Sequence, residues 1–189
     1  MSSPDSQQRR AEIIHAVWAV IARGGVGAVT FRTVAAESGA SVGRIQHHFG
    51  TRDGLLLASL RAMVDAAADA NPEALEAPAL DRLRALLLHS IPADEASRIG
   101  ASVWFGFVAA GVAEPALGAE VVAARRGVEA AVAACLEGLL PDGADAGAAA
   151  RELVLLADGA TGAALVGAIS PEAGRAAVVG AAARLGLEL

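Results

Sequence analysis

The segment SVGRIQHHFGTRDGLL, which spans residues 41–56, gathers side chains that can recognise nucleic acid. Its nitrogen-bearing members are Arg44, Gln46, His47, His48 and Arg52. An arginine can bind guanine O6 and N7 with two hydrogen bonds, and a glutamine can pair with adenine in the same way. Histidines and a further arginine suit phosphate oxygens. We interpret the segment as a candidate surface for double-stranded DNA.

Two short helices must position these groups. Thr30 and Ser41 are residue types that cap helix N-termini, and Gly39 can take the left-handed conformation that ends a helix. We therefore expect one helix that ends at Gly39 and another over residues 42–48. With Ile45 directed inward, the pair has the proportions of a helix-turn-helix motif whose second helix enters the DNA major groove. The capped N-termini at Thr30 and Ser41 also offer backbone N–H groups to phosphates.

The composition favours helices throughout the chain. Of 189 residues, 54% are hydrophobic but only 3% are aromatic, and β-branched residues never alternate as they do in strands. Apolar spacing and Gly or Pro breakers predict about nine helices and an all-α fold. We expect a DNA-binding domain over residues 1–50 and a helical domain over residues 51–189, linked by a helix from 51 to about 70.

Charge is distributed unevenly along the chain. Residues 1–61 hold seven arginines and four acidic residues, whereas residues 62–189 hold eight arginines and 17 acidic residues. The net positive charge of residues 1–61, next to an acidic remainder, suggests that residues 1–61 alone bind an anionic partner. Chance asymmetry on solvated faces is the alternative.

Cysteine usage and hydropathy predict a cytoplasmic protein that does not enter a membrane. Cys135 is a single cysteine, which excludes an internal disulfide framework. No basic segment precedes an apolar N-terminal run, so we expect no signal peptide. The longest apolar stretch, residues 159–169, is shorter than the roughly 20 residues that a membrane-spanning helix needs.

The sequence gives little support for a catalytic site or a metal site. The run GASVG, residues 39–43, matches the G-x-S-x-G pattern of hydrolases, but that motif requires a strand before it. No strand is predicted there, so a capping role for Ser41 is the better interpretation. His15, His89 and Cys135 do not have the spacing of metal ligands. We predict no enzyme activity, no metal and no cofactor.

Residues 10–60 resemble a known family. The run TFRTVAAESGASVGRIQHHFGTRDGLL is similar to the N-terminal signature of TetR/AcrR-type transcriptional regulators. The resemblance implies a three-helix DNA-binding domain, a C-terminal helical domain for ligand binding and dimerisation, and a homodimer on a pseudo-palindromic operator. Gln46 stands where the family often has Tyr, and Arg52 replaces its usual Lys.

The resemblance also implies two kinds of DNA contact, position by position. Phosphate contacts are implied at Thr30, His48 and Arg52. Base or groove contacts are implied at Arg32, Val42, Gly43, Arg44, Gln46 and His47.

The C-terminal part contains a cluster of aromatic residues. The run ASVWFGFVAAGVAEPAL holds three of the six aromatics in the chain and somewhat resembles the choline–betaine repressor subgroup. On a helix, Trp104, Phe107 and Val108 share one stripe, which could line a pocket for an apolar or cationic small-molecule effector. Ordinary core packing explains these residues equally well. Further candidates for the pocket are Met63, Asp158 and Thr161.

The run ADGATGAALVGAIS indicates a helix interface. Gly159, Ala163 and Gly167 recur at every fourth residue and offer a smooth stripe for close helix packing. Two C-terminal helices from each of two subunits could form a four-helix bundle, as the family resemblance also implies. Packing within one subunit is the alternative.

These patterns together predict a sequence-specific transcriptional regulator, most simply a ligand-responsive homodimeric repressor. A transcriptional activator of the same family is one alternative. A helical adaptor that binds proteins and no DNA is the other.

Overall fold

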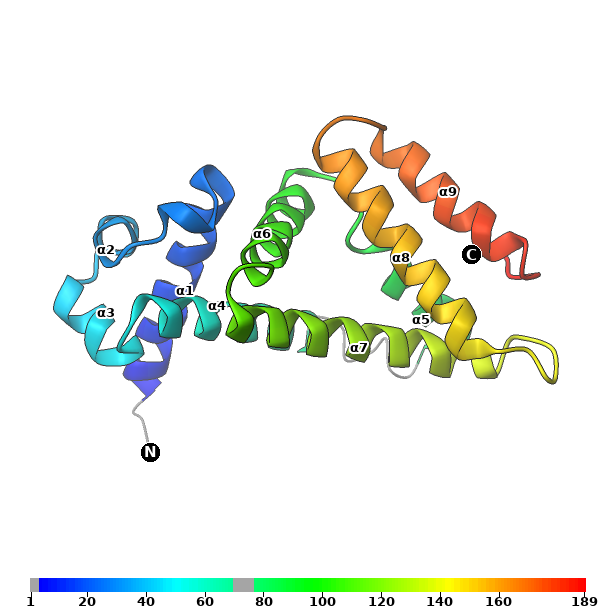
Figure 1. Cartoon of the computed structure of the whole chain (residues 1–189), viewed down its shortest axis with the longest axis horizontal. Coiled ribbons are helices and arrows are strands. Elements are labelled where there is room, and N and C mark those ends of the chain that lie inside the picture. The colour runs from blue at the N-terminus through cyan, green and yellow to red at the C-terminus, as the bar shows by residue number, and fades with distance from the viewer. Residues whose placement is uncertain (1–3, 70–76) are drawn as a thin grey trace. The chain divides into compact units, whose positions relative to one another are not determined.

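The computed structural model describes residues 4–69 and 77–189, and every regular element in these residues is a helix (Figure 1). The all-α prediction is therefore confirmed. None of the described helices is both long enough and apolar enough to span a membrane. The elements are α1 (Pro4–Gly24), the 3-10 turn η1 (Val26–Ala28), α2 (Phe31–Ser38), α3 (Val42–Phe49), α4 (Arg52–Asp69), α5 (Ala79–Leu88), α6 (Glu95–Gly111), α7 (Pro115–Glu137), α8 (Ala146–Leu165) and α9 (Pro171–Ala183).

The chain forms two compact units. The first holds the residues up to Ala68 together with Ser102–Val121, and the second holds Asp69–Ala101 together with Val122–Leu189. Helices α6 and α7 each contribute residues to both units.

The first unit is built on one apolar core. Val17 of α1, Val34 of α2, Ile45 of α3 and Phe107 of α6 are all fully buried in it. The start of α4 belongs to the same core, because it buries Leu55, Leu56 and Leu60 there. The compact unit that carries the helix-turn-helix segment therefore continues past residue 50.

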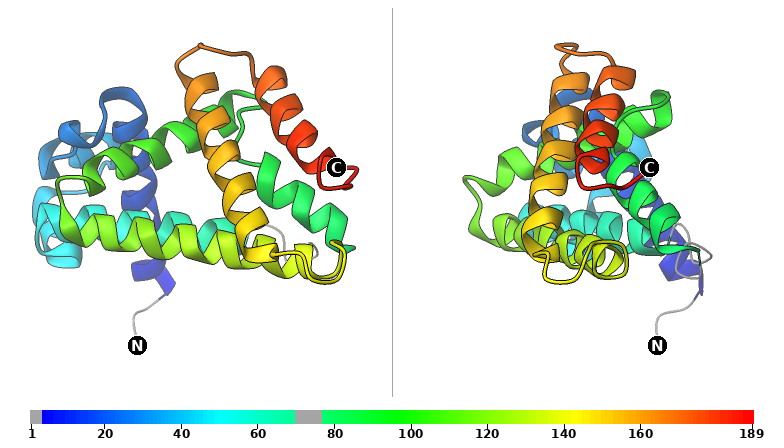
Figure 2. Two further views of the ribbon diagram at one scale, coloured as in Figure 1. Left: turned by 45° about the vertical axis from the view of Figure 1, so that its right-hand side comes forward. Right: turned by 90° about the vertical axis from the view of Figure 1, so that its right-hand side faces the viewer.

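The second unit has a separate core. Leu83 and Leu87 of α5, Leu136 of α7, Leu153 of α8 and Val178 of α9 are buried within it. Helices α8 and α9 run side by side in both views of Figure 2. Burial of apolar side chains from α5, α7, α8 and α9 supplies the main driving force for this packing.

Helix α8 ends earlier than its apolar pattern suggests. The predicted stripe of Gly159, Ala163 and Gly167 requires a helix that reaches Gly167, but α8 stops at Leu165. Gly167 adopts a positive φ of 75°, and the N–H of Ala168 donates to the carbonyl of Ala163 at 2.9 Å. This is the hydrogen-bond pattern of a Schellman cap, in which glycine ends the helix. Gly167 thus lies in the turn before α9 and not on the predicted helical stripe.

Candidate nucleic-acid interface

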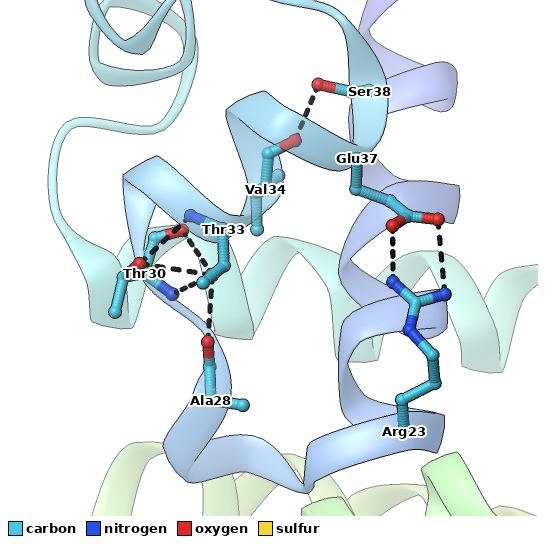
Figure 3. Close-up of polar contacts among 7 residues, drawn as sticks. All are labelled: Arg23, Ala28, Thr30, Thr33, Val34, Glu37 and Ser38. Atoms are coloured by element: carbon cyan, nitrogen blue, oxygen red, sulfur yellow. Dashed lines mark hydrogen bonds and ion pairs between the residues drawn. The ribbon is translucent and has the colours of Figure 1, made fainter.

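The first turn of α2 is fixed by two threonines. Thr33 N donates to Thr30 Oγ1 at 3.1 Å, and Thr30 N donates to Thr33 Oγ1 at 2.9 Å (Figure 3). The predicted cap at Thr30 is therefore confirmed as a reciprocal capping box. Thr33 also donates its hydroxyl to the carbonyl of Ala28 at 2.8 Å, which ties the helix to the preceding loop.

The turn between α2 and α3 follows the expected geometry. Gly39 has a φ of 69°, in the left-handed region, and its N–H donates to Ala35 O at 3.0 Å. Ser38 Oγ donates to the carbonyl of Val34 at 2.8 Å in the same turn (Figure 3). A residue with a Cβ would be strained at position 39.

An ion pair joins α2 to the end of α1. The guanidinium of Arg23 meets both carboxylate oxygens of Glu37, as Figure 3 shows. The Arg23 side chain is 62% exposed, so we expect the pair to contribute at most about 1 kcal/mol. Its contribution is mainly to orient α2.

Two apolar residues anchor helix α3 by packing its buried side into the core. Ile45 is fully buried and Phe49 is 9% exposed. Ser41 caps the helix by accepting a hydrogen bond from Arg44 N at 3.3 Å. At its far end α3 lies very close to α4, because a Cβ built on Gly54 would come within 2.4 Å of Phe49 O.

The opposite side of α3 is exposed and polar. Arg44, Gln46 and His47 are exposed, whereas Val42 and His48 are half-buried. Gly43 is exposed and has open space where a Cβ would lie. Arg32, in the first turn of α2, is exposed as well. One short helix thus presents a fork-shaped donor, an amide and an imidazole, from Arg44, Gln46 and His47, on its exposed side.

Arg52 differs from the other predicted contact residues. Its Nε donates to Val29 O at 2.8 Å and its Nη2 donates to Val26 O at 2.9 Å. Its Nη1 lies 3.7 Å from a carboxylate oxygen of Asp53 and 3.7 Å from one of Glu114. The guanidinium is therefore engaged by the loop before α2, a role that the sequence analysis did not predict.

Sequence reasoning also missed Arg9. A surface hollow of about 160 Å³ lies between the start of α1 and the turn after α2, and both Arg9 and Arg44 line it. Glu12 on its rim offsets part of their charge. The adjacent arginines at positions 9 and 10 were the sequence feature that could have indicated further positive charge near Arg44.

The residues predicted to line an effector pocket fall in both units. Met63, Trp104 and Val108 are half-buried against the core of the first unit, where Phe107 is fully buried. In the second unit, Thr161 is 1% exposed; its hydroxyl donates to Ala157 O at 2.8 Å.

Asp158 is half-buried in the second unit and pairs with Arg125. Arg125 Nη1 contacts Asp158 Oδ2, which no other described residue hydrogen-bonds. Burial raises the pKa of the Asp158 carboxyl above its ordinary value, and the positive charge of Arg125 offsets part of that rise. Within the described residues, no three side chains of His, Cys, Asp or Glu are grouped so as to hold a metal ion.

The residues predicted to form an interface lie on or near α8. Gly159 is exposed and Ala163 is half-buried, while Gly167 is exposed in the turn beyond the helix. Two large apolar side chains accompany them: Leu155 is 55% exposed and Val166 is 80% exposed. Leu155 lies within α8 and Val166 is its C-cap residue, so both are available to a partner that would cover this helix.

Two family models match the chain. Residues 13–59 match the model described as bacterial regulatory proteins, tetR family. Residues 78–186 match the model described as BetI-type transcriptional repressor, C-terminal. The first match contains all of α2 and α3, and the second extends from α5 to the end of α9.

Individual proteins agree with these matches. The HTH-type transcriptional regulator PksA of Bacillus subtilis (strain 168) is 31% identical over 107 residues, 56% of this chain and 52% of PksA. The chain thus spans about half the length of that relative.

Two solved structures are similar over nearly the whole chain. One is a protein from Rhodococcus sp. assigned as a TetR-family transcriptional regulator, with a TM-score of 0.85, 27% identity, and coverage of 94% of this chain and 98% of that one. The other, from Saccharomonospora viridis, is assigned as a transcriptional regulator and was crystallised with choline. It has a TM-score of 0.80, 25% identity, and coverage of 91% and 94%.

Proposed function

We propose a function from the premise that this chain belongs to the tetR family of bacterial regulatory proteins and carries a BetI-type C-terminal region. It is a transcriptional repressor that binds a DNA operator through α3. The observation that carries the proposal is the two-sided character of α3, which buries Ile45 and Phe49 and exposes Arg44, Gln46 and His47.

The proposed contacts divide into two groups. Arg44 and Gln46 have the geometry to read base edges in the major groove, and His47 lies beside them. His48 and the N-termini capped by Thr30 and Ser41 suit phosphates; Arg32, Val42 and Gly43 complete the surface that faces the groove.

Operator binding requires two copies of the chain. A pseudo-palindromic operator presents successive major grooves about 34–36 Å apart, and one α3 reaches only one of them. We propose that α8 and α9 of two subunits associate through the exposed face around Leu155, Gly159 and Ala163. A homodimer of this kind buries the apolar side chains that one copy leaves in water.

A small-molecule effector would control DNA binding. The half-buried residues Met63, Trp104 and Val108 of the first unit suit an apolar or cationic molecule. Such a molecule releases DNA only if it binds the DNA-free arrangement of the subunits more tightly than the DNA-bound one. Transcriptional control places its action in the cytoplasm, where the operator is.

A gel-shift assay tests the proposal. The DNA is the region upstream of the protein's own gene, searched for an inverted repeat, and the purified chain is titrated at several salt concentrations. We expect a discrete complex whose affinity falls steeply as salt rises. Choline, with glycerol as an uncharged control, is then added as a probe for release. A chain that binds no duplex at low salt would refute the repressor proposal and leave the protein-binding adaptor.

A further inference from the structure

The loop that η1 and Val29 form before α2, residues 26–29, depends on side chains from outside it. Residues 26–29 contain three carbonyl groups that accept hydrogen bonds from distant or following side chains. Thr33 donates to Ala28 O, and Arg52 donates to both Val26 O and Val29 O. Val29 directly precedes the α2 cap, so the orientation of its carbonyl sets the direction in which α2 begins.

Arg52 is well suited to hold this loop. Its two donor bonds, at 2.8 and 2.9 Å, come from different nitrogens of one planar group and reach two carbonyls that are three residues apart. Hydrogen bonds from a charged donor are stronger than neutral ones, and the planar fork is already shaped for paired acceptors. A lysine ammonium is a point charge on a flexible stem and has no such fork.

A third element approaches the same guanidinium. Glu114, in the corner between α6 and α7, lies 3.7 Å from the Arg52 Nη1 atom, which bonds neither loop carbonyl. The corner is tightly built, since a Cβ on Gly118 would come within 2.6 Å of Gly111 O. Helix α6 also approaches the loop directly: a Cβ on Gly106 would come within 3.6 Å of the Val26 side chain.

We propose that Arg52 is a positioning residue for DNA binding and not a phosphate contact. The hydrogen bonds from its guanidinium to residues 26–29, which we call the latch, set α2 and α3 in the orientation that DNA requires. Glu114 connects the latch to the α6–α7 corner. The inference rests on the proposed function, because the orientation matters only to a chain that binds DNA. It replaces the phosphate role that family resemblance implies for this position.

Arg52→Lys and Arg52→Ala separate the two roles. Non-specific binding to a mixed-sequence duplex is measured by fluorescence anisotropy over a range of salt concentrations. If Arg52 positions the loop, both variants lose affinity, roughly tenfold, and both keep the parent's salt dependence. If Arg52 contacts a phosphate, the lysine variant binds like the parent and the alanine variant lowers the slope of log affinity against log salt by about 0.9. That second result would overturn the proposal.

Arg44→Ala serves as the matched control. Its side chain is exposed on α3 and supplies none of the hydrogen bonds that hold residues 26–29, so its removal is expected to leave that segment unchanged, unlike the change at position 52. Amide hydrogen exchange over residues 26–33 gives a readout that needs no DNA. Exchange should be faster in Arg52→Lys than in the parent and unchanged in Arg44→Ala; equal exchange in the parent and Arg52→Lys would refute the latch. If the parent binds no duplex, the proposed function fails while hydrogen exchange still decides the latch.

Discussion

The indole nitrogen of Trp18 donates a hydrogen bond to the backbone carbonyl of Ser59 at 3.1 Å and thereby ties α1 to α4 across 41 residues of sequence. Both helices pack on the core that supports α2 and α3. The helices that carry the candidate DNA surface therefore rest on a frame that is braced by a polar contact as well as by apolar packing.

Trp18→Phe removes this bond and keeps an aromatic ring at the site. We expect the free energy of unfolding to fall by about 1 kcal/mol, because one partly buried hydrogen bond is lost and some ring contact with it. Urea denaturation followed by circular dichroism measures the change. Equal denaturation midpoints and slopes for the two proteins would show that the bond does not brace the unit.

Two glycines near α3 should respond in opposite ways to alanine. Gly54→Ala places a methyl group against Phe49 O, so we expect a loss of about 1–3 kcal/mol of stability. Gly43→Ala adds a methyl group in open space within a helix, so we expect a gain of about 0.5–1 kcal/mol. The same Gly43 variant should bind DNA less tightly, because its methyl group faces the duplex. A Gly43→Ala chain that is more stable and binds DNA as the parent does would remove Gly43 from the contact surface.

Leu155→Arg tests the proposed dimer. A charge in the centre of the exposed face of α8 cannot be buried against a second copy without a large desolvation cost. Size-exclusion chromatography with light scattering should show dimers for the parent and monomers for the variant. Arg126→Ala, an exposed change on α7, is the control and should remain dimeric. A dimeric Leu155→Arg protein would place the interface elsewhere.

Asp158 gives the stability of the protein a defined pH dependence. Its pKa in the folded chain lies above the ordinary 3.8, so the folded state holds this proton more tightly than the unfolded state does. The free energy of unfolding therefore falls as the pH rises from about 3.8 through the folded-state pKa. Asp158→Asn should lack this component, and the difference between the two stability curves isolates it. A parent that gains stability relative to the variant over that interval would reverse the sign.

The local features of α2 and α3 were predictable because interactions between residues close in sequence determine them. Thr30 and Ser41 begin helices since their side chains each satisfy the N–H group three residues later, and Gly39 ends α2 since it adopts a positive φ without strain. Ile45 and Phe49 are four residues apart and so share the buried side of α3. Each of these relationships is contained within one turn of helix.

The remaining features depend on contacts between distant residues. Arg52 bonds carbonyls that lie 23 and 26 residues earlier in the chain, and nothing in its immediate sequence indicates that direction. The need for glycine at position 54 arises from the approach of α4 to the end of α3. Phe107 shares a helical stripe with Trp104, but only the packed structure shows that Phe107 is fully buried and Trp104 is not.

The central claim is that α3 reads DNA sequence, and Arg44 tests it most directly. Operator duplexes substituted at one base pair at a time are bound to the parent and to Arg44→Ala, and the free energy of binding is measured by fluorescence anisotropy. The parent should lose about 1–3 kcal/mol at the base pair that Arg44 contacts in each half-site. Arg44→Ala should bind the original and the substituted duplex at that position equally well. If Arg44→Ala discriminates at every position as the parent does, α3 does not read the operator through this residue and the account is contradicted.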